Sequence, residues 1–301
     1  MESGPVVALV GAGAVARSLA HALGQVGVPI AAVLSRSESS ARALSEEVGA
    51  PLWGCVGQRA LPRITDLFIA VPDGELASVA ASLKAPSWEG VWVAHMSGAL
   101  TARELDSLRE RGAITCSFHP MQSFLRERIS SFSGIYIGVE GDPEAVARAV
   151  WWAERLGARA VLVPPEAKGL YHIAGILASN YLIALLGVAQ EVLAGLDVRG
   201  ERAFALLQPL VRGALENAEA LGDPERALSG PIRRGDVLTL QRHGQVLAER
   251  LPHLIPLYVA MGIETVRIAV RKGYLEPERA QAVLAELERI LRWDPSEESL
   301  P

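Results

Sequence analysis

Three groups of polar residues in this sequence have the types and spacing that acid–base chemistry requires. Lys168 and His172 are four positions apart, so they share one face of a helix. A cationic lysine beside a histidine can polarise a carbonyl and exchange a proton. The chain contains only three lysines, Lys84, Lys168 and Lys272, so a lysine inside a polar motif is notable. The competing interpretation is a solvated surface pair, against which the apolar residues around it argue.

Two further histidines each follow an apolar run. His95 is followed by Ser97 and Gly98, and His119 is followed by Pro120. If both runs are parallel strands, the two histidines lie at the edge of the sheet where ligands bind in open α/β folds. This position is equally consistent with contact to a substrate and with a purely structural role for the two histidines.

A turn late in the chain, Gly230–Asp236, holds two adjacent arginines. Arg233 and Arg234 can bind a carboxylate or a phosphate of a substrate, whereas Asp236 either joins that site or caps the next helix. Asn180, Arg233 and Asp236 are therefore candidates for substrate binding. The histidines and Asp236 are an alternative metal site, but no H-E-x-x-H or comparable ligand spacing occurs, so no metal is expected.

The elements that must position these groups begin with a glycine turn. The sequence Gly11-Ala12-Gly13-Ala14-Val15-Ala16 follows an apolar run at 6–10 and opens an alanine-rich stretch. This G-x-G-x-x-A pattern between strand and helix is typical of dinucleotide binding, with a pyrophosphate at the helix N-terminus. The residues expected to hold it are Gly11, Gly13, Ala14, Val15 and Ala16. The alternative is a tight turn without a ligand.

The second apolar run, 28–34, ends in Ser35-Arg36-Ser37, where NAD-preferring folds usually place an acidic residue. Arg36 instead suits a 2′-phosphate, because its planar guanidinium binds phosphate oxygens. NADP(H) is therefore the expected cofactor, held also by Ser35 and Ser37; a solvated loop arginine is the alternative. The residues expected on the nicotinamide side are Val71, Pro72, Asp73 and Ser97. Asp73 also fits a helix cap.

The alternation of apolar strands and helical segments in the first half predicts a doubly wound α/β domain over residues 1–163. Strands are expected at 5–10, 28–35, 66–71, 90–95, 113–118, 134–140 and 159–163, with a short one at 51–56. Helices are expected between them at 13–25, 38–48, 74–83, 101–111 and 143–156. Residues 164–301 show only helical patterns, at 165–195, 200–221, 236–250, 253–272 and 277–292, and predict an all-helical domain. Pro209 and Pro256 are expected to bend or break two of these helices.

Composition limits the function further. Half of the residues are apolar and the net charge is −5, which argues against a nucleic-acid partner. Cys55 and Cys116 have no C-x-x-C spacing, and the N-terminal residues lack a basic signal-peptide region, so a cytoplasmic protein is expected. The apolar stretch 173–189 is interpreted as a helix in a domain or dimer core rather than a membrane span, which predicts a homodimer through the helical domain.

Together these motifs resemble a family. The H-x-S-G at His95–Gly98, the F-H-P at Phe118–Pro120, the K-x-x-Y-H…A-S-N-Y at Lys168–Tyr181 and the G-P-x-x-R-G-D at Gly230–Asp236 are similar to those of Rossmann-like proteins with a DUF2520 C-terminal domain. The wider group includes pyrroline-5-carboxylate reductase, ketopantoate reductase and 6-phosphogluconate dehydrogenase. The resemblance covers nearly the whole chain.

That resemblance implies an NADP-binding Rossmann domain, a 6-phosphogluconate dehydrogenase-like helical dimerisation domain and an active site in the cleft between them. In the dehydrogenase relatives a lysine and an asparagine four residues later serve catalysis. Lys168 matches the lysine, whereas His172 stands where the asparagine would be.

Two hypotheses follow. The first is an NADP(H)-dependent oxidoreductase that acts on a small anionic carbonyl, imine or alcohol. Lys168 would then be the general acid/base or carbonyl polariser, with His172, His95 and His119 as helpers. The second is a non-catalytic NADP(H)-binding sensor or interaction protein on the same fold. The substrate and the direction of the reaction do not follow from the sequence.

Overall fold

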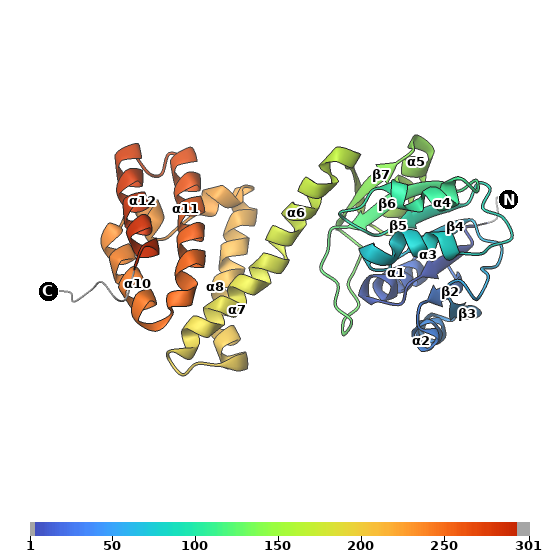
Figure 1. The fold of residues 1–301 in the computed structure, drawn as a ribbon, viewed down its shortest axis with the longest axis horizontal. Helices are drawn as coiled ribbons and strands as arrows, with labels where there is room; N and C mark the ends of the chain where they lie inside the picture. The colour runs from blue at the N-terminus through green and yellow to red at the C-terminus, as the bar shows by residue number, and fades with distance from the viewer. Residues whose placement is uncertain (1–3, 294–301) are drawn as a thin grey trace. The chain divides into compact units, whose positions relative to one another are not determined.

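The computed structural model describes residues 4–293, and the chain divides into two compact units between Leu182 and Ile183. The first unit is an α/β fold built on one eight-stranded sheet (Figure 1). Its strands are β1 (Val7–Val10), β2 (Ile30–Ser35), β3 (Leu52–Cys55), β4 (Asp66–Ile69), β5 (Trp92–His95), β6 (Ile114–Pro120), β7 (Tyr136–Gly141) and β8 (Arg159–Leu162). All the expected strands are present, including the short one near residues 51–56.

The strand order β3-β2-β1-β4-β5-β6-β7-β8 is that of a doubly wound sheet with two added strands. Neighbouring strands from β3 through β6 are parallel, whereas β7 runs antiparallel to β6 and parallel to β8. The helices of this unit are α1 (Ala14–Gln25), α2 (Glu38–Val48), α3 (Leu76–Ser82), α4 (Asp106–Arg109), α5 (Pro143–Arg155) and α6 (Lys168–Ala178). Because β1, β4, β5 and β6 are parallel, their carboxyl ends meet at one edge of the sheet.

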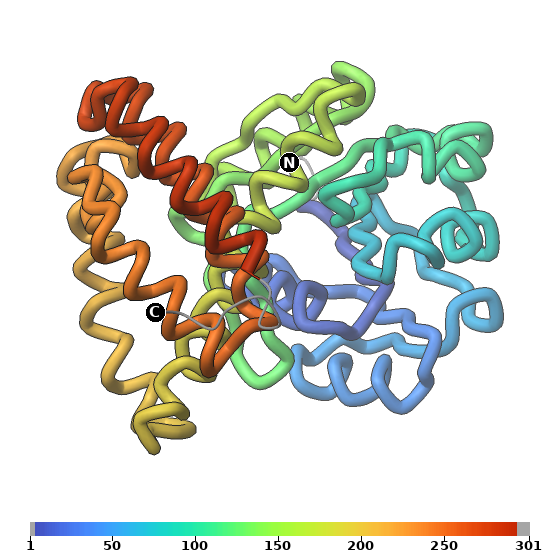
Figure 2. The backbone as a smooth tube through the Cα atoms, turned by 60° about the vertical axis from the view of Figure 1, so that its left-hand side comes forward, coloured from blue at the N-terminus to red at the C-terminus, as the bar shows by residue number. Residues whose placement is uncertain are grey.

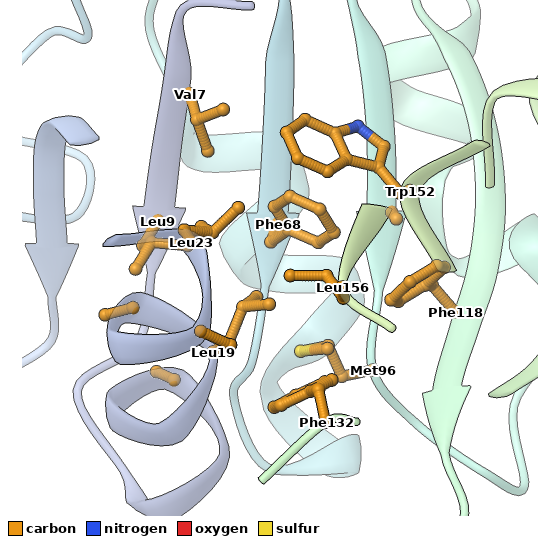
Figure 3. Packing of buried hydrophobic residues seen from close by; sticks show 14 of the residues in the cluster. Val7, Leu9, Leu19, Leu23, Phe68, Met96, Phe118, Phe132, Trp152 and Leu156 are labelled. Atoms are coloured by element: carbon orange, nitrogen blue, oxygen red, sulfur yellow. The ribbon is translucent and has the colours of Figure 1, made fainter. Parts of the chain in front are cut away.

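Aromatic side chains fasten α5 to the sheet (Figure 3). Trp152 lies edge-on to Phe68 of β4, with ring centroids 5.4 Å apart, and Phe68 contacts Phe118 of β6 at 5.6 Å. Burial of each such ring contributes about 2–3 kcal/mol. Asp66 is fully buried, and its carboxylate accepts hydrogen bonds from the Trp152 indole at 2.8 Å and from the Arg148 guanidinium at 2.9 Å. This ion pair fixes α5 at the end of the sheet opposite the strands' carboxyl ends.

The second unit is helical in its described part. Its helices are the C-terminal part of α7 (Asn180–Ala194), α8 (Gly200–Leu221), α9 (Pro231–Arg234), α10 (Val237–Arg250), α11 (Ile255–Arg271) and α12 (Pro277–Leu291). Its core lies among α9 to α12 and includes the fully buried residues Leu240, Ala269, Val283 and Leu287. The sequence therefore predicted the α/β and all-helical classes correctly. The division between the units falls within α7, later than the boundary at residue 163 expected from the patterns.

Helix interruptions differ in detail from the expectation. Pro209 lies inside α8 without ending it, whereas Pro256 lies in the first turn of α11, where a missing N–H has no cost. The single helix expected at 165–195 is a 3₁₀ turn followed by α6 and α7, which are separated at Ser179. The expected helix at 101–111 is a 3₁₀ turn (Ala102–Leu105) that leads into the short α4.

The apolar helices α6 and α7 are not buried within this chain. The segment Pro165–Ala194 is long and apolar enough to cross a membrane, and none of its most apolar window is buried. Pro252–Arg271 passes the same test, but a third of its window is buried. Large exposed side chains on the first segment are Leu170, Ile173, Leu177, Tyr181, Ile183 and Val192. The apolar stretch 173–189 is therefore not buried in a domain core. Burial of this stretch in a dimer interface remains a prediction.

Candidate cofactor and active site

The glycine turn has the geometry that its residue types require. Gly11 has φ of +112°, and its N–H donates to the Leu34 carbonyl at 2.7 Å. A Cβ on Gly11 would lie 2.1 Å from the Ala70 carbonyl oxygen, so no other residue fits between β1 and β4. Gly13 precedes α1 and has open space where its Cβ would be. Gly11 thus allows the backbone of the turn to pack tightly against β4, and Gly13 leaves space beside the start of α1.

The N-terminus of α1 is left without side-chain partners. No side chain caps it, and its first turn holds no acidic residue. The N–H groups of Ala14 and Val15 and the positive end of the helix dipole are therefore available to an anion. Ala16 is 1% exposed and packs into the core.

A cavity of about 370 Å³ lies at this edge of the sheet, entirely within the first unit. Its lining brings together every residue expected to bind the cofactor except Ala16, whose place in the core fits a packing role. The lining residues are Gly11, Ala12, Gly13, Ala14, Val15, Ser35, Arg36, Ser37, Ser40, Ala70, Val71, Pro72, Asp73, Glu75, Met96, Ser97 and Arg126. Binding of a dinucleotide there remains a prediction.

The charged residues of this cavity are of both signs. Arg36, whose side chain is 79% exposed, forms an ion pair with Glu75. Ser37 caps α2, accepting a hydrogen bond from the Ser40 N–H. Asp73 begins a 3₁₀ turn, but no side-chain cap is formed there, so its expected capping role is not seen. A ligand phosphate at Arg36 must therefore displace or share the Glu75 carboxylate.

A row of buried polar residues crosses β5, β6 and β7. His95 pairs in register with Ser117, and Ser117 pairs with Glu140. All three are buried. His95 Nδ1 accepts from the Ser97 N–H at 3.2 Å, so its Nε2–H donates to the Thr101 carbonyl at 3.0 Å.

Glu140 of β7 holds the loop that follows β5, which His95 also holds. Its carboxylate accepts from the Ala102 N–H at 2.8 Å, next to the Thr101 carbonyl that His95 holds. The Ser97 hydroxyl adds two bonds inside the loop, accepting from the Ala99 and Leu100 N–H groups. The polar row therefore fixes the backbone of residues 97–102 at the cavity.

Lys168, at the start of α6, reaches into this row. Its side chain is 2% exposed, and its ammonium donates to the Ser97 carbonyl at 3.2 Å and to the Ser117 hydroxyl at 2.5 Å. The Ser117 hydroxyl in turn donates to the Ser97 carbonyl at 3.3 Å. Because an ammonium has three protons, one is left without an acceptor among residues 4–293.

Burial lowers the pKa of Lys168 to about 8, because the charged form loses its hydration. The Glu140 and Asp73 carboxylates oppose this change and keep the pKa from falling further. Lys168 is therefore mainly a cation at neutral pH, and it can release a proton more easily than a solvated lysine.

His119, Tyr171 and His172 form a second cluster beside the loop. The Tyr171 hydroxyl donates to the His119 carbonyl at 3.3 Å and lies 3.2 Å from His119 Nδ1. The His172 ring stands edge-on to the His119 ring, with centroids 6.2 Å apart. If Nδ1–H donates to Tyr171, the lone pair of neutral His119 is on Nε2.

Glycines make room for this cluster. A Cβ on Gly98 would lie 2.8 Å from His119 Nε2, and one on Gly138 would lie 2.6 Å from the Tyr171 ring. Burial lowers the pKa of His119 to about 4, and electrostatic interaction with Lys168 and His172 acts in the same direction. His119 is thus neutral at pH 7.

The structure separates the four expected catalytic residues by environment. Lys168 contacts Ser97, and His119 lies beside Gly98 and the His172 ring. His95 is fully buried, and both ring nitrogens are bonded to the backbone, while burial beside Lys168 lowers its pKa to about 4. His95 therefore positions the loop and has no nitrogen free to exchange a proton with a ligand.

The expected substrate-binding residues lie elsewhere. Asn180 is the exposed first residue of α7. Arg233 lies over the Tyr274 ring at 4.1 Å, and Asp236 caps α10 by accepting from the Thr239 N–H. The cap is one of the two roles expected for Asp236. Within residues 4–293, no group of three His, Cys, Asp or Glu side chains is arranged to hold a metal ion.

Sequence reasoning missed several residues that the structure places at the site. Ser117 and Glu140 gave no local motif, because only strand register brings them beside Lys168. Tyr171 lay within the K-x-x-Y-H motif and received no role. Glu75 reaches the cavity from the 3₁₀ turn before α3, and Arg126 reaches it from the segment between β6 and β7, whose path the sequence does not specify.

Comparisons with known proteins agree with this architecture. Residues 3–120 match the model of a Rossmann-like domain, and residues 135–265 match that of a domain of unknown function, DUF2520. No curated protein matches the sequence significantly. Among solved structures, a candidate NADP oxidoreductase of Bacteroides fragilis is 24% identical, with a TM-score of 0.72 over 87% of this chain and 97% of its own.

Protein TM1727 of Thermotoga maritima is 25% identical, with a TM-score of 0.68, and the match covers 89% of this chain and 99% of that one. A reductive aminase of Aspergillus terreus, solved with NADPH and ethyl levulinate, is 17% identical, with a TM-score of 0.64 over 93% of this chain and 99% of its own. These likenesses extend over both units and show a shared fold. The chain thus matches a Rossmann-like model and then a DUF2520 model along its length, the order that its sequence motifs implied.

Proposed function

We propose that this protein is an NADP(H)-dependent oxidoreductase that acts on a small anionic carbonyl, imine or alcohol. The observation that carries the proposal is the double role of Ser97. It lines the cavity beside the glycine turn, and its carbonyl accepts a hydrogen bond from the buried ammonium of Lys168. A dinucleotide site and a candidate acid–base group are thereby one residue apart.

The residues present fit a nicotinamide dinucleotide. The missing Cβ of Gly13 and the uncapped start of α1 suit a diphosphate, and Arg36 suits a 2′-phosphate. When bound, NADPH would supply the hydride of the reaction. The names of the candidate NADP oxidoreductase and of the reductive aminase that share this fold support the same cofactor.

The chain's own groups would supply the proton. Lys168 holds a proton at Nζ with a pKa near neutrality, which is suited to polarising a carbonyl or imine and to proton exchange. The neutral His119 and the half-buried His172 stand beside it as helpers. The anionic character of the substrate rests on the sequence motif at Gly230–Asp236, whose adjacent arginines Arg233 and Arg234 can bind a carboxylate or a phosphate.

The first test is a fluorescence titration with NADPH and, separately, with NADH. Binding of NADPH at least about tenfold tighter, a difference of about 1.4 kcal/mol, would support the role of Arg36. A screen of ketoacids, imines and 2-hydroxy acids would follow, monitored by NADPH absorbance. Lys168→Ala should abolish turnover while NADPH binding persists.

A second candidate, a non-catalytic NADP(H)-binding sensor, is favoured by the burial of Lys168. Its ammonium is 2% exposed and already has two acceptors within the protein, as a structural lysine would. NADPH binding without oxidation of NADPH by any of the screened compounds would support this candidate. Equal turnover by the wild type and Lys168→Ala would remove Lys168 from the mechanism without excluding an enzyme.

The proposed enzyme is a cytoplasmic homodimer that binds neither nucleic acid nor membrane. Exposed leucines and isoleucines on α6, α7 and α8 give the single chain more apolar surface than monomers usually show. A second copy of the chain is the expected cover for these helices. Light scattering that gives only the monomer mass of 32.1 kDa would contradict the dimer.

A further inference from the structure

The segment between β6 and β7, residues 121–135, carries a tip that reaches the cofactor cavity. At this tip Leu125 and Arg128 form an isolated antiparallel bridge, with Arg126 and Glu127 between them. Figure 2 shows this green segment running beside α1, in dark blue. Arg126 lines the cavity together with the glycine turn, although it lies more than a hundred residues away in sequence.

Two residues near the start of α1 hold the segment in place. The Arg17 guanidinium donates to the Arg126 carbonyl at 2.9 Å and, through Nε, to the Glu47 carboxylate of α2 at 2.8 Å. The Ser18 hydroxyl accepts from the Ser130 N–H at 3.1 Å. Arg126 is therefore tied to the turn of α1 that follows the dinucleotide fingerprint.

The base of the segment is also fixed. Phe132 is buried in the core and its ring lies 5.5 Å from that of Phe124. The Ser130 hydroxyl donates to the Ser123 carbonyl at 3.1 Å, closing the segment on itself. Anchored at base and tip, the backbone presents Arg126 to the cavity in a defined position.

Charge indicates what Arg126 is suited to bind. Of the two arginines that line the cavity, Arg36 is paired with Glu75. The Arg126 guanidinium has no hydrogen-bond or ion-pair partner within residues 4–293. An unpaired guanidinium beside an uncapped helix N-terminus is suited to a phosphate group, which it can bind through two N–H groups at once.

We propose that Arg126 binds the diphosphate of the nicotinamide dinucleotide, together with the N-terminus of α1. This inference rests on the proposed function, because it assumes that a dinucleotide occupies the cavity. It assigns different phosphates to the two arginines: the diphosphate, common to NADH and NADPH, to Arg126, and the 2′-phosphate, present only in NADPH, to Arg36.

The test is a calorimetric titration of the full-length protein and its variants with NADPH, NADH and ADP-ribose. Arg126→Ala should weaken the binding of all three by a similar factor of about tenfold, or 1.4 kcal/mol. Arg126→Lys should recover part of the loss, because it keeps the charge without the planar fork. Arg128→Ala is the matched control, since it changes the same tip outside the cavity lining and should leave all three affinities unchanged.

Each other outcome contradicts the assignment in a distinct way. A loss confined to NADPH would place the 2′-phosphate, not the diphosphate, at Arg126. Unchanged affinities in Arg126→Ala would show that this side chain does not bind the cofactor, although the proposed function would stand. If the wild type binds none of the three molecules, the proposed function itself fails. Circular dichroism of each variant would establish that its fold is intact.

Discussion

Lys168 donates a hydrogen bond to the Ser97 carbonyl at 3.2 Å, and Ser97 also lines the cavity that begins at the glycine turn. The contact joins the first helix after the sheet to a loop that follows β5. That loop is held in turn by His95 and Glu140. A lysine that is remote in sequence is thus coupled to the cavity at the glycine turn through one peptide group.

Ser117→Ala should change the pH dependence of turnover. The Ser117 hydroxyl accepts a hydrogen bond from the charged form of Lys168, so its removal should lower the pKa of Lys168 below its value of about 8. For a mechanism that needs protonated Lys168, wild-type kcat/KM falls as the pH rises through about 8. The variant's fall should occur at lower pH. The measurement is kcat/KM from pH 6 to about 10, the range in which a perturbed lysine titrates.

Thr115→Val is the control for this prediction. Thr115 is buried on the same strand, two residues before Ser117, and is not among the hydrogen-bond acceptors of the Lys168 ammonium in residues 4–293. Its pH profile should coincide with that of the wild type. A Ser117→Ala profile that also coincides would show that Lys168 does not set the alkaline limb.

Lys168→Met should stabilise the fold near neutral pH. The pKa of Lys168 is lowered from 10.5 to about 8, so the folded state holds this charge at a cost of up to about 3 kcal/mol. Lost hydrogen bonds to Ser97 and Ser117 offset part of the gain, which leaves an expected increase of about 1–2 kcal/mol in the free energy of unfolding. Urea denaturation of both proteins measures it.

The pH dependence of that increase has a definite sign. Below pH 8 the folded and unfolded states both hold the proton, and the cost is fully present. Between pH 8 and 10.5 the folded state releases the proton first, so the difference between Lys168→Met and the wild type should shrink as the pH rises. Lys84→Met, at an exposed lysine, should show no such change. A constant difference from pH 7 to about 9.5 would contradict the burial of a charged Lys168.

The contrast between Lys168 and Ser117 explains how far the sequence could predict this site. Periodicity of apolar residues specified the strands and helices, and the carboxyl ends of parallel strands then placed His119 and the glycine turn at one edge. Lys168 was recognisable because it lies in a motif. Ser117 and Glu140 were not, since their proximity depends on the register of three strands and on an antiparallel pairing that single-strand patterns do not encode.

His95 illustrates a second limit. Its position at a strand end suggested chemistry, but a histidine there is equally able to satisfy backbone groups of the next loop. Only the two bonds from its ring, to the Ser97 N–H and the Thr101 carbonyl, distinguish the two roles. The apolar stretch 173–189 shows a third limit: hydrophobicity predicts that a surface will be covered, but not by what.

Glu75→Gln should increase the affinity for NADPH more than the affinity for NADH. The Glu75 carboxylate pairs with Arg36, so a 2′-phosphate must compete with it for the guanidinium. Removing the negative charge while keeping the shape should tighten NADPH by about twofold to fivefold, which corresponds to an exposed ion pair of about 0.4–1 kcal/mol. Titrations with NADPH and NADH measure the ratio. Glu38→Gln, an exposed acid in the first turn of α2, controls for the change in net charge.

Two alanine substitutions in the glycine turn should separate folding from binding. Gly11→Ala places a Cβ 2.1 Å from the Ala70 carbonyl oxygen and forces an alanine to φ of +112°. The backbone strain alone costs about 1–3 kcal/mol, so the variant should unfold at a lower temperature.

Gly13→Ala adds a methyl group to open space at an ordinary φ of −82°, so its unfolding temperature should stay close to that of the wild type. The methyl group would nevertheless stand where the diphosphate approaches α1, and the Kd of NADPH and NADH should rise together by tenfold or more, about 1.4 kcal/mol. A Gly13→Ala protein that binds both cofactors as tightly as the wild type would show that no diphosphate lies against this turn, whatever its stability.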